Sequence, residues 1–446
     1  MGKLFGTDGV RGVANKELTS ELAFTLGRAA TAFFGREHER PVFLIGRDTR
    51  ISGQMLESSL AAGICSAGGQ AVIAGVMPTP AVAYLTRKLN AQAGIVISAS
   101  HNPYPDNGIK FFAASGYKLP DATEDQLEEM VLAPSDTMPR PTGDKVGTVV
   151  FHHDLLREYI NYAIGTVDTD FKGLKIVVDC ANGAAYEAAP VVLKRLGAEV
   201  IVLNNQPNGV NINDCCGSTH LEQIRQAVLD HKADLGIAHD GDADRCLAID
   251  EKGQVVDGDQ IMVICALNLM KNQHLKQNTL VTTVMSNIGL HQAVKKAGGN
   301  VLVTPVGDRY VLEAMREKDL SLGGEQSGHI IFSDYSTTGD GILTALQLIT
   351  ALRKSGKKLS ELAGLMTRFP QTLINVRLKT KEGWQENRAI AAAIQAGEKE
   401  LGENGRILVR ASGTEPLLRV MAEGPDMPQL ESIVQMIVDV VKKELA

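Results

Sequence analysis

Three carboxylates alternate with small residues in Asp240-Gly-Asp-Ala-Asp-Arg245, between the apolar runs Leu235–Ala238 and Cys246–Ile249. Carboxylates this close repel one another, and a turn between apolar runs tolerates them only when a cation or close hydrogen bonds compensate for lost hydration. Oxygen ligands select a hard cation, Mg²⁺ before Mn²⁺ or Ca²⁺. The spacing therefore predicts a divalent-metal site whose ligands are Asp240, Asp242 and Asp244.

Three other interpretations compete with a metal site in this run. An EF-hand loop carries glycine at its sixth position, which is Arg245 here, and has helices rather than the strands predicted for these flanks. Phosphatases with an aspartyl nucleophile usually carry Thr or Val where Asp244 stands. A solvated turn stays open as an alternative, because Asp and Gly are ordinary turn residues.

A second candidate site follows the predicted buried strand Ala93–Ala99, which runs into Ser100-His-Asn-Pro103. Loops at the carboxyl ends of strands hold the ligands in α/β sheets, so Ser100 stands where a nucleophile is useful. His101 is adjacent, and Lys110 lies on a segment expected to fold back beside the loop; either can move a proton or hold phosphoryl charge. An ordinary turn is the alternative, whereas a Ser-His-Asp esterase fits poorly because no Gly-x-Ser-x-Gly elbow surrounds Ser100.

Two further turns carry groups that hydrogen-bond to a phosphorylated or polyhydroxy ligand. The predicted strands Arg406–Arg410 and Leu417–Met421 flank Ala411-Ser-Gly-Thr-Glu-Pro416, whose hydroxyls, amides and neighbouring guanidiniums suit a phosphate cradle, with a plain hairpin as the alternative. Glu325-Gln-Ser-Gly-His329 offers hydrogen bonds to a polyhydroxy ligand, or is a solvated loop with a surface histidine. No Gly-x-x-x-x-Gly-Lys-Ser/Thr loop occurs in the sequence, so a nucleoside triphosphate is not the indicated donor.

The composition is that of an ordinary soluble globular protein, with 446 residues, 44% apolar and 22% charged. A formal charge of −7 gives no basic surface for nucleic acid, so an anionic substrate must be gathered by a local patch. Arg11 and Arg47 stand in loops rich in glycine and charge, where they either meet a phosphate or pair with neighbouring aspartates.

The elements that would position these groups repeat along the chain. Apolar strands at Val42–Ile45, Lys175–Val178 and Thr279–Thr283 are each followed by a turn and a helix that ends at a glycine, which predicts three related α/β domains. The last part reads strand, helix, strand, turn, strand, helix, with helices at Glu386–Leu401 and Pro428–Leu445, which predicts a smaller α+β domain. The expected domains, from the turn and proline signals between them, are 1–150, 151–254, 255–368 and 369–446.

The cellular setting is predicted from the cysteines and the termini. The six cysteines show no Cys-x-x-Cys or zinc spacing, and we expect buried thiols in a reducing compartment. The N-terminus lacks an apolar signal core, and no run approaches the ~20 apolar residues of a membrane span. We therefore expect a cytoplasmic protein without a nucleic-acid or membrane partner, and a homodimer from the general frequency of dimers.

Taken in order, these motifs resemble the α-D-phosphohexomutase superfamily over essentially the whole chain. The resemblance lies in Ser98–Pro103, Asp240–Arg245, Gly324–His329 and Arg410–Pro416. The opening Phe5–Gly12, the Ile97-Ser-Ala-Ser100 form of the serine loop and Gln326 resemble the branch that acts on glucosamine phosphates. Phosphomannomutase or phosphoglucomutase activity is the near alternative, and a metal-dependent sugar-phosphate phosphatase is a more distant one.

The resemblance implies four domains around a central cleft and an isomerase that interconverts glucosamine 6-phosphate and glucosamine 1-phosphate, which feeds UDP-N-acetylglucosamine synthesis. It implies that Ser100 carries a phosphoryl group, that the product forms through a 1,6-bisphosphate, and that one Mg²⁺ is bound by Asp240, Asp242, Asp244 and a phosphoserine oxygen. His101, Lys110, Arg245 and His329 would assist charge and proton transfer. The implied substrate-binding residues are Thr7, Arg11, Glu325, Ser327, Arg410, Ser412, Gly413, Thr414 and Arg419.

Overall fold

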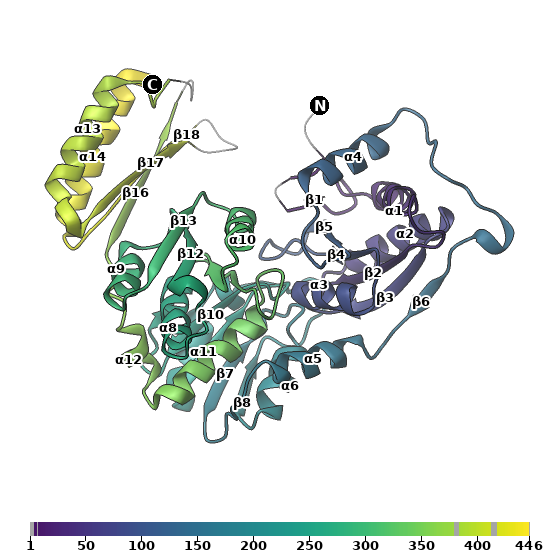
Figure 1. Cartoon of the computed structure of the whole chain (residues 1–446), viewed down its shortest axis with the longest axis horizontal. Coiled ribbons are helices and arrows are strands. Elements are labelled where there is room, and N and C mark those ends of the chain that lie inside the picture. The colour runs from purple at the N-terminus through teal and green to yellow at the C-terminus, as the bar shows by residue number, and fades with distance from the viewer. Residues whose placement is uncertain (1–3, 7, 379–382, 412–416, 446) are drawn as a thin grey trace. The chain divides into compact units, whose positions relative to one another are not determined.

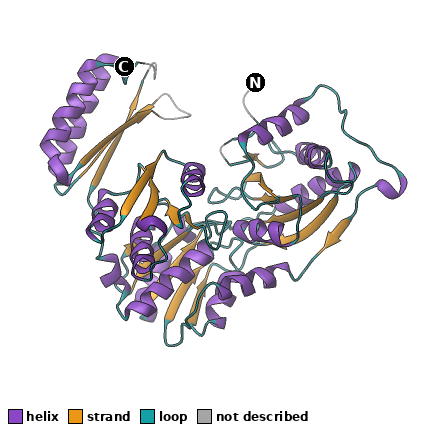
Figure 2. Ribbon diagram, viewed as in Figure 1, coloured by secondary structure: helices purple, strands orange, loops and turns teal. Residues whose placement is uncertain are grey.

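The computed structural model describes residues 4–6, 8–378, 383–411 and 417–445. The chain divides into two compact units, Met1–Val284 with Leu302–Gly364 and Met285–Val301 with Leu365–Ala446. Strands and helices alternate along it, and the helices flank the sheets (Figures 1 and 2). This is the mixed α/β architecture that the sequence predicts.

The first sheet has the strand order β1-β5-β4-β2-β3-β6. Its strands are β1 (Val10–Val13), β2 (Val42–Arg47), β3 (Gln70–Val76), β4 (Ala93–Ile97), β5 (Asp106–Ala113) and β6 (Val149–Phe151), and its helices are α1 (Ser20–Phe34), α2 (Gly53–Ser66), α3 (Thr79–Lys88) and α4 (Asp121–Leu132). β2 pairs in parallel with β3 and β4, whereas β5 returns antiparallel to β4. The loops after β2 and β4 therefore meet at one edge of the sheet.

The second sheet has the order β11-β10-β9-β7-β8. Its strands are β7 (Lys175–Asp179), β8 (Glu199–Leu203), β9 (Leu235–His239), β10 (Cys246–Asp250) and β11 (Val255–Val256), with helices α5 (Leu155–Gly165), α6 (Ala188–Arg195) and α7 (Glu222–His231). β9 and β10 are antiparallel and pair His239 with Cys246, so the six residues between them form a hairpin loop. The Asp run is thus flanked by strands, as predicted.

The third sheet has the order β13-β12-β14-β15. Its strands are β12 (Thr279–Thr283), β13 (Asn300–Thr304), β14 (Leu322–Gly324) and β15 (Ile330–Phe332), and the helices of this part are α8 (Gly258–Lys271), α9 (Ile288–Lys296), α10 (Asp308–Glu317), α11 (Gly341–Ser355) and α12 (Leu359–Ala363). β14 and β15 are antiparallel and hold Glu325–His329 in the turn between them.

The fourth sheet, β16-β18-β17, confirms the predicted smaller α+β part. Its elements are β16 (Gln371–Arg377), α13 (Arg388–Leu401), β17 (Arg406–Ala411), β18 (Leu417–Glu423) and α14 (Met427–Leu445). α13 begins two residues later than predicted from Glu386, because the Asn387 side chain accepts hydrogen bonds from the amides of Ala389 and Ile390 and so caps the helix.

Helix α9 packs with this C-terminal sheet. The buried Glu423 carboxylate accepts a hydrogen bond from the Ile288 amide at 3.0 Å and pairs with Arg406 at 2.7 Å. Arg406 also donates to the Ser286 carbonyl at 2.8 Å. One buried carboxylate therefore joins the start of α9 to strands β17 and β18.

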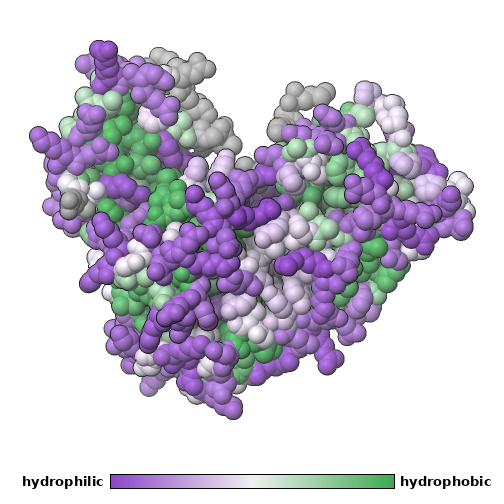
Figure 3. Space-filling view, in the orientation of Figure 1, coloured by the Kyte–Doolittle hydropathy of each residue, from purple (hydrophilic) through white to green (hydrophobic). Residues whose placement is uncertain are grey.

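Hydrophilic residues predominate on the face seen in Figure 3. None of the helices in the described part of the chain is long and apolar enough to cross a membrane. All six cysteines are free, and four of them are buried as predicted. Cys65 is only partly buried, and the prediction is wrong for Cys215, which is exposed. Its φ of +51° puts it in a left-handed turn outside the strands and helices.

We predict a pH-dependent loss of stability from His291 on α9. Burial and the nearby Arg406 charge lower the pKa of His291 to about 4, below the ~6.5 of an unfolded chain. Between these values the unfolded state binds a proton that the folded state excludes, so stability falls as the pH falls through this window. Chemical denaturation at about pH 7.5 and about pH 5 should show that wild type loses about 1–2 kcal/mol more than His291→Gln, after allowance for solvent screening.

The control is His38→Gln, at an exposed position. This variant should lose stability in parallel with wild type. An equal loss in wild type and His291→Gln would contradict the assignment.

Candidate active site

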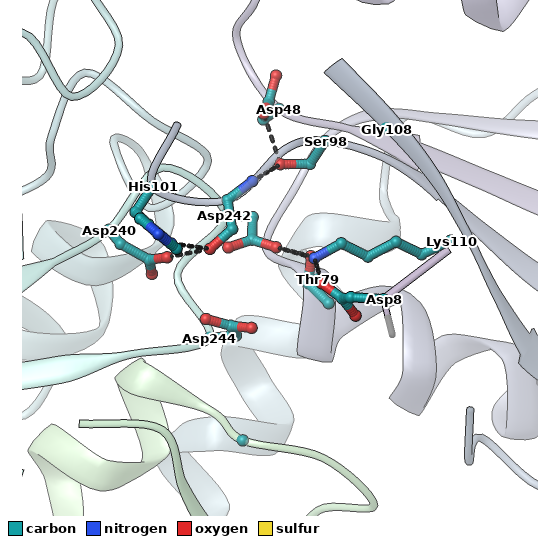
Figure 4. Close-up of polar contacts among 12 residues, drawn as sticks. Asp8, Asp48, Thr79, Ser98, His101, Gly108, Lys110, Asp240, Asp242 and Asp244 are labelled. Atoms are coloured by element: carbon teal, nitrogen blue, oxygen red, sulfur yellow. Dashed lines mark hydrogen bonds and ion pairs between the residues drawn. The ribbon is translucent and has the colours of Figure 1, made fainter. Parts of the chain in front are cut away.

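The three aspartates of the β9–β10 loop gather in one buried cluster. Asp240 and Asp242 are 1% exposed and Asp244 is 8% exposed, and one carboxylate oxygen of each lies within 4.8 Å of the others. Ala243 adopts a left-handed φ of +60°, which turns the loop sharply between Asp242 and Asp244. The predicted carboxylate crowding is therefore present in three dimensions (Figure 4).

Each carboxylate has its own neighbours. Asp240 Oδ2 accepts a hydrogen bond from Ser100 Oγ at 2.6 Å, and Asp242 Oδ2 accepts from Thr79 Oγ1 at 2.7 Å. Burial, with the charges of Asp244 and Asp242, raises the pKa of Asp240. Burial would also raise the pKa of Asp242, but Lys110 and the Thr79 hydroxyl lower it below its usual value.

The cluster has the donor set of a hard cation. Among the described residues, neither Asp242 Oδ1 nor Asp244 Oδ1 has a hydrogen-bond partner, although both atoms are buried. Buried carboxylate oxygens without a donor are costly, and a divalent cation would satisfy them and relieve the repulsion within the cluster. Oxygen-only ligands fit Mg²⁺ or a similar ion.

Ser100 lies in the loop that follows β4, and several hydrogen bonds hold this loop in place. It is buried, and its left-handed φ of +51° is unusual for a residue other than glycine. The Arg50 guanidinium donates to the carbonyls of Ser100 at 2.9 Å and Asn102 at 2.8 Å, and Asn213 Nδ2 donates to the same two carbonyls at 2.9 and 3.0 Å. These donors hold the Ser100 hydroxyl on Asp240 despite the strained backbone.

Lys110 reaches the cluster from β5, as the expected return of the chain predicts. Its register partner on β4 is Val96, and its ammonium lies 3.0 Å from Asp242 and 2.9 Å from Asp8. Burial would lower the pKa of Lys110, but the Asp242 and Asp8 carboxylates raise it above its usual value. Figure 4 shows this ammonium between the two carboxylates.

His101 and Arg245 lie beside the serine and the carboxylates. His101 Nδ1 is 3.4 Å from Ser100 Oγ, and burial together with the Arg245 charge lowers the His101 pKa. The Arg245 Nε atom is 3.8 Å from Asp244 Oδ1.

The turn between β14 and β15 joins the same cluster. Arg245 and His329 form an isolated antiparallel bridge, and His329 Nδ1 lies 3.3 Å from Asp244 Oδ2. Burial would lower the pKa of His329, but Asp244 raises it to about 9. His329 is 4% exposed, so the alternative of a surface histidine is wrong.

The other two candidate groups of this turn, Glu325 and Ser327, differ in their hydrogen bonding. Glu325 Oε1 accepts from the Gly307 amide at 3.2 Å, whereas the buried Ser327 Oγ has no hydrogen-bond partner among the described residues.

The remaining candidates lie in the N-terminal loop and the C-terminal unit. Arg11 pairs with Asp8, and Arg47 pairs with Glu57 at 3.4 Å. Arg410 and Arg419 stand directly opposite each other on β17 and β18, and burial with the Arg419 charge lowers the Arg410 pKa. Opposed guanidiniums repel each other and favour an anion between them. Thr7, Ser412, Gly413 and Thr414 lie outside the described residues.

Several groups of the site were missed by sequence reasoning. Asp48 and Arg50 follow β2, and the shared edge of parallel strands was a signal that could have placed them beside Ser100. Asp8 was indicated by sequence only as a neighbouring aspartate with which Arg11 pairs, and not as a partner of Lys110. Thr79 and Asn213 gave no signal, because their contacts come from chain segments distant in sequence.

Four family models match the chain, each a domain of phosphoglucomutase/phosphomannomutase: α/β/α domain I over residues 2–137, α/β/α domain II over 157–253, α/β/α domain III over 257–369 and the C-terminal domain over 373–440. Phosphoglucosamine mutase of Heliobacterium modesticaldum is 56% identical and covers 99% of this chain and 100% of its own. Phosphoglucosamine mutase of Symbiobacterium thermophilum is 57% identical, with 100% of both chains covered. A phosphoglucomutase/phosphomannomutase family protein of Burkholderia thailandensis has a similar structure, with a TM-score of 0.84, 25% identity and coverage of 99% of this chain and 97% of that one.

We predict that Arg50→Met lowers the free energy of unfolding by about 3–5 kcal/mol, the cost of breaking a buried ion pair from one side. Arg50 pairs with the buried Asp48 at 2.9 Å, so the substitution leaves that carboxylate without its cation and the carbonyls of the serine loop without their guanidinium donor. Urea denaturation measures the loss, and the exposed Arg36→Met should stay within about 0.5 kcal/mol of wild type. A loss below about 1 kcal/mol at Arg50 would show that water replaces its hydrogen bonds.

Proposed function

The chain belongs to the phosphoglucomutase/phosphomannomutase family, and on that premise we propose that it is an isomerase that interconverts glucosamine 6-phosphate and glucosamine 1-phosphate. The observation that carries the proposal is the 2.6 Å hydrogen bond from Ser100 Oγ to Asp240 Oδ2. It places a hydroxyl that can bear a phosphoryl group directly on a cluster of buried carboxylates. The names of relatives 56% and 57% identical to this chain support the choice of glucosamine phosphate.

Ser100 carries the phosphoryl group in the active enzyme. It donates this group to the free hydroxyl of the sugar phosphate, which gives glucosamine 1,6-bisphosphate and a free Ser100 hydroxyl. The bisphosphate turns end for end and returns its other phosphoryl group to Ser100, so the product leaves and no nucleotide is consumed. Such transfer depends chiefly on positioning and on stabilising charge, which the rigid serine loop and its charged neighbours provide.

Asp240, Asp242 and Asp244, with an oxygen of the phosphoryl group on Ser100, bind one Mg²⁺ per subunit. Bound there, the cation stabilises charge on the transferred phosphoryl oxygens. The support is the oxygen-only donor set and the two carboxylate oxygens that have no hydrogen-bond partner in the described structure.

The cationic groups around the serine assist charge and proton transfer. Lys110, Arg245 and His329 surround the carboxylates and stabilise phosphoryl charge, and His101 is placed 3.4 Å from Ser100 Oγ, within reach of its reacting oxygen. Glu325 and Ser327 hold sugar hydroxyls, and the free Ser327 Oγ supports this role.

The non-reacting phosphate binds to the C-terminal part of the chain. Its ligands are Arg410, Ser412, Gly413, Thr414 and Arg419, with Thr7 and Arg11 as further substrate contacts. We assign one loop each to domains 1–150, 151–254, 255–368 and 369–446. The homodimer expected from sequence is testable by size-exclusion chromatography with light scattering.

We predict that Ser100→Ala lowers turnover on glucosamine 6-phosphate by on the order of 10⁴-fold or more, because the group that carries the phosphate is lost. Phosphorus NMR of the sugar phosphates measures turnover, and peptide mass spectrometry shows the phosphate on Ser100 of wild type. Ser135→Ala, at an exposed position, is the matched control and should behave as wild type.

Two results would overturn the proposal. Release of inorganic phosphate at the turnover rate, with activity surviving Ser100→Ala, would indicate a phosphatase. A clear preference of wild type for glucose or mannose phosphate would favour phosphoglucomutase or phosphomannomutase.

We also predict that Mg²⁺ binds about tenfold or more tightly to enzyme phosphorylated on Ser100 than to the dephosphorylated form, since the phosphate adds an anionic oxygen ligand. Isothermal titration calorimetry measures both affinities. Asp244→Asn should weaken binding by a similar factor or more, whereas Asp230→Asn, an exposed control on α7, should not. Equal affinity of the two forms would count against phosphate coordination.

A further inference from the structure

A series of alternating charges leaves the carboxylate cluster at Asp242 and returns to it at Asp244. Each link is an ion pair between described residues, with the imidazole of His329 in its protonated form. Two of the groups, Lys118 and Asp308, have no role in the site so far, and Asp8 has been described only as a partner of Lys110 and Arg11. The links are Asp242–Lys110 at 3.0 Å, Lys110–Asp8 at 2.9 Å, Asp8–Lys118 at 2.7 Å, Lys118–Asp308 at 2.6 Å, Asp308–His329 at 3.5 Å and His329–Asp244 at 3.3 Å. We call these seven residues the charge ring.

Lys118 enters the ring through the turn that follows β5. Gly116, at a φ of +78°, closes this turn, and the Ala113 amide donates to the Tyr117 carbonyl at 2.8 Å. The turn sets Lys118 opposite Phe112 in an antiparallel bridge. Directly opposed residues share a face, and residues two apart on a strand do too, so Lys118 lies on the same face as Lys110.

Asp8 is held over this face by the neighbouring strand. β1 pairs with β5 so that Val10 faces Ile109. Gly9 has a φ of +80°, and a Cβ atom there would lie 2.4 Å from the Ile109 carbonyl oxygen, so only glycine lets the chain come this close. The Asp8 carboxylate is thereby placed between the two lysines.

Asp308 meets Lys118 from the first turn of α10. Three other side chains also hold the turn after β5, which carries Lys118, against the part of the chain that contains α10. Arg309 donates to the Leu119 carbonyl at 3.0 Å, Thr337 Oγ1 donates to the Gly116 carbonyl at 2.5 Å, and the Arg316 guanidinium lies 4.3 Å from the centre of the Tyr117 ring. These contacts fix the backbone at Lys118, so its ammonium is held against the carboxylates of Asp8 and Asp308.

We propose that Lys118 is a positioning residue for phosphoryl transfer, which joins Asp8 and Asp308 so that Lys110 and His329 are held at fixed places on the carboxylate cluster. The proposal rests on the proposed function, since it concerns the groups that stabilise charge on the transferred phosphoryl group. Lys118 touches neither the serine nor the carboxylate cluster in the described contacts, so it acts through its two partners.

Removal of the ammonium would act on both sides at once. Asp8 and Asp308 each lie within 2.7 Å of the same nitrogen, so without it two carboxylates face each other in a largely buried place. They separate to reduce their repulsion. The ion pairs of Asp8 with Lys110 and of Asp308 with His329 then change in geometry, which displaces Lys110 and His329 on the carboxylate cluster. A displacement of about 1 Å at a reacting site costs about 100-fold in rate.

The experiment compares Lys118→Met, Lys118→Arg and Lys88→Met with wild type. Lys88→Met is the matched control, because it breaks a 2.6 Å pair with Glu158 that lies outside the charge ring. For Lys118→Met we expect kcat to fall about 10- to 100-fold with KM within about threefold, since positioning acts on the transition state more than on binding. Lys118→Arg, which keeps the charge, should recover kcat to within about fivefold of wild type, and Lys88→Met should match wild type.

A double-mutant cycle with Asp308→Asn separates this role from a merely structural ion pair. If the two residues act as one unit, Lys118→Met/Asp308→Asn loses about as much kcat as the more damaging single variant. Losses that multiply would overturn the proposal. Asp308→Asn removes the same contact from its other end, so a normal kcat in that variant would also overturn it, even where Lys118→Met fails to fold.

Wild type in the same assays separates this proposal from the proposed function. If wild type does not convert glucosamine 6-phosphate, the proposed function fails. If wild type is active and Lys118→Met keeps its kcat, or loses it only together with a Tm shift that Lys118→Arg does not reverse, then the positioning role alone fails.

Discussion

The mutual repulsion of Asp240, Asp242 and Asp244 is the constraint on which the rest of this structure depends. Two like charges about 5 Å apart repel by about 3 kcal/mol at an effective dielectric of about 20, and all three carboxylates are buried. The chain surrounds them with hydroxyl donors and cations that come from three different sheets. In the proposed function the groups that make the cluster tolerable also stabilise phosphoryl charge, so stability and chemistry depend on the same side chains.

Strand topology explains why so many of these groups converge. β2 and β4 run in parallel, so their following loops share an edge, and this brings the Asp48–Arg50 pair under the Ser100 loop. β5 returns antiparallel to β4 and places Lys110 one strand away from the serine. Two antiparallel hairpins, β9–β10 and β14–β15, then bring the carboxylates and His329 together through the bridge at Arg245.

Much of this was predictable from local pattern and part of it was not. Apolar periodicity and turn residues predict three features: the strands on either side of the Asp run, the return of the chain to Lys110, and the order of the last five elements. The contact of His329 with Asp244 joins residues from two hairpins, and nothing in its own turn distinguished a buried histidine from an exposed one. Thr79 and Asn213 likewise became visible only with the fold, because hydrogen bonds to a distant loop leave no periodic signal in sequence.

The grouping of α9 with the C-terminal sheet shows the same limit. Residues 285–301 lie in the middle of a predicted α/β segment, yet the start of α9 is hydrogen-bonded to β17, β18 and the chain before β16. The determining residue, Glu423, lies two residues beyond the predicted strand Leu417–Met421. Its burial beside Arg406 and the start of α9 follows from tertiary packing alone.

The left-handed backbone at Ser100 has a consequence for which hydroxyl amino acid this position accepts. Threonine offers the same hydroxyl oxygen, but a β-branched side chain at a φ of +51° is strained against its own backbone. Exchange of serine for threonine, conservative in chemical terms, therefore conflicts with the local conformation. The main-chain conformation, held by hydrogen bonds from Arg50 and Asn213, therefore favours serine over threonine at this position whether or not a substrate is bound.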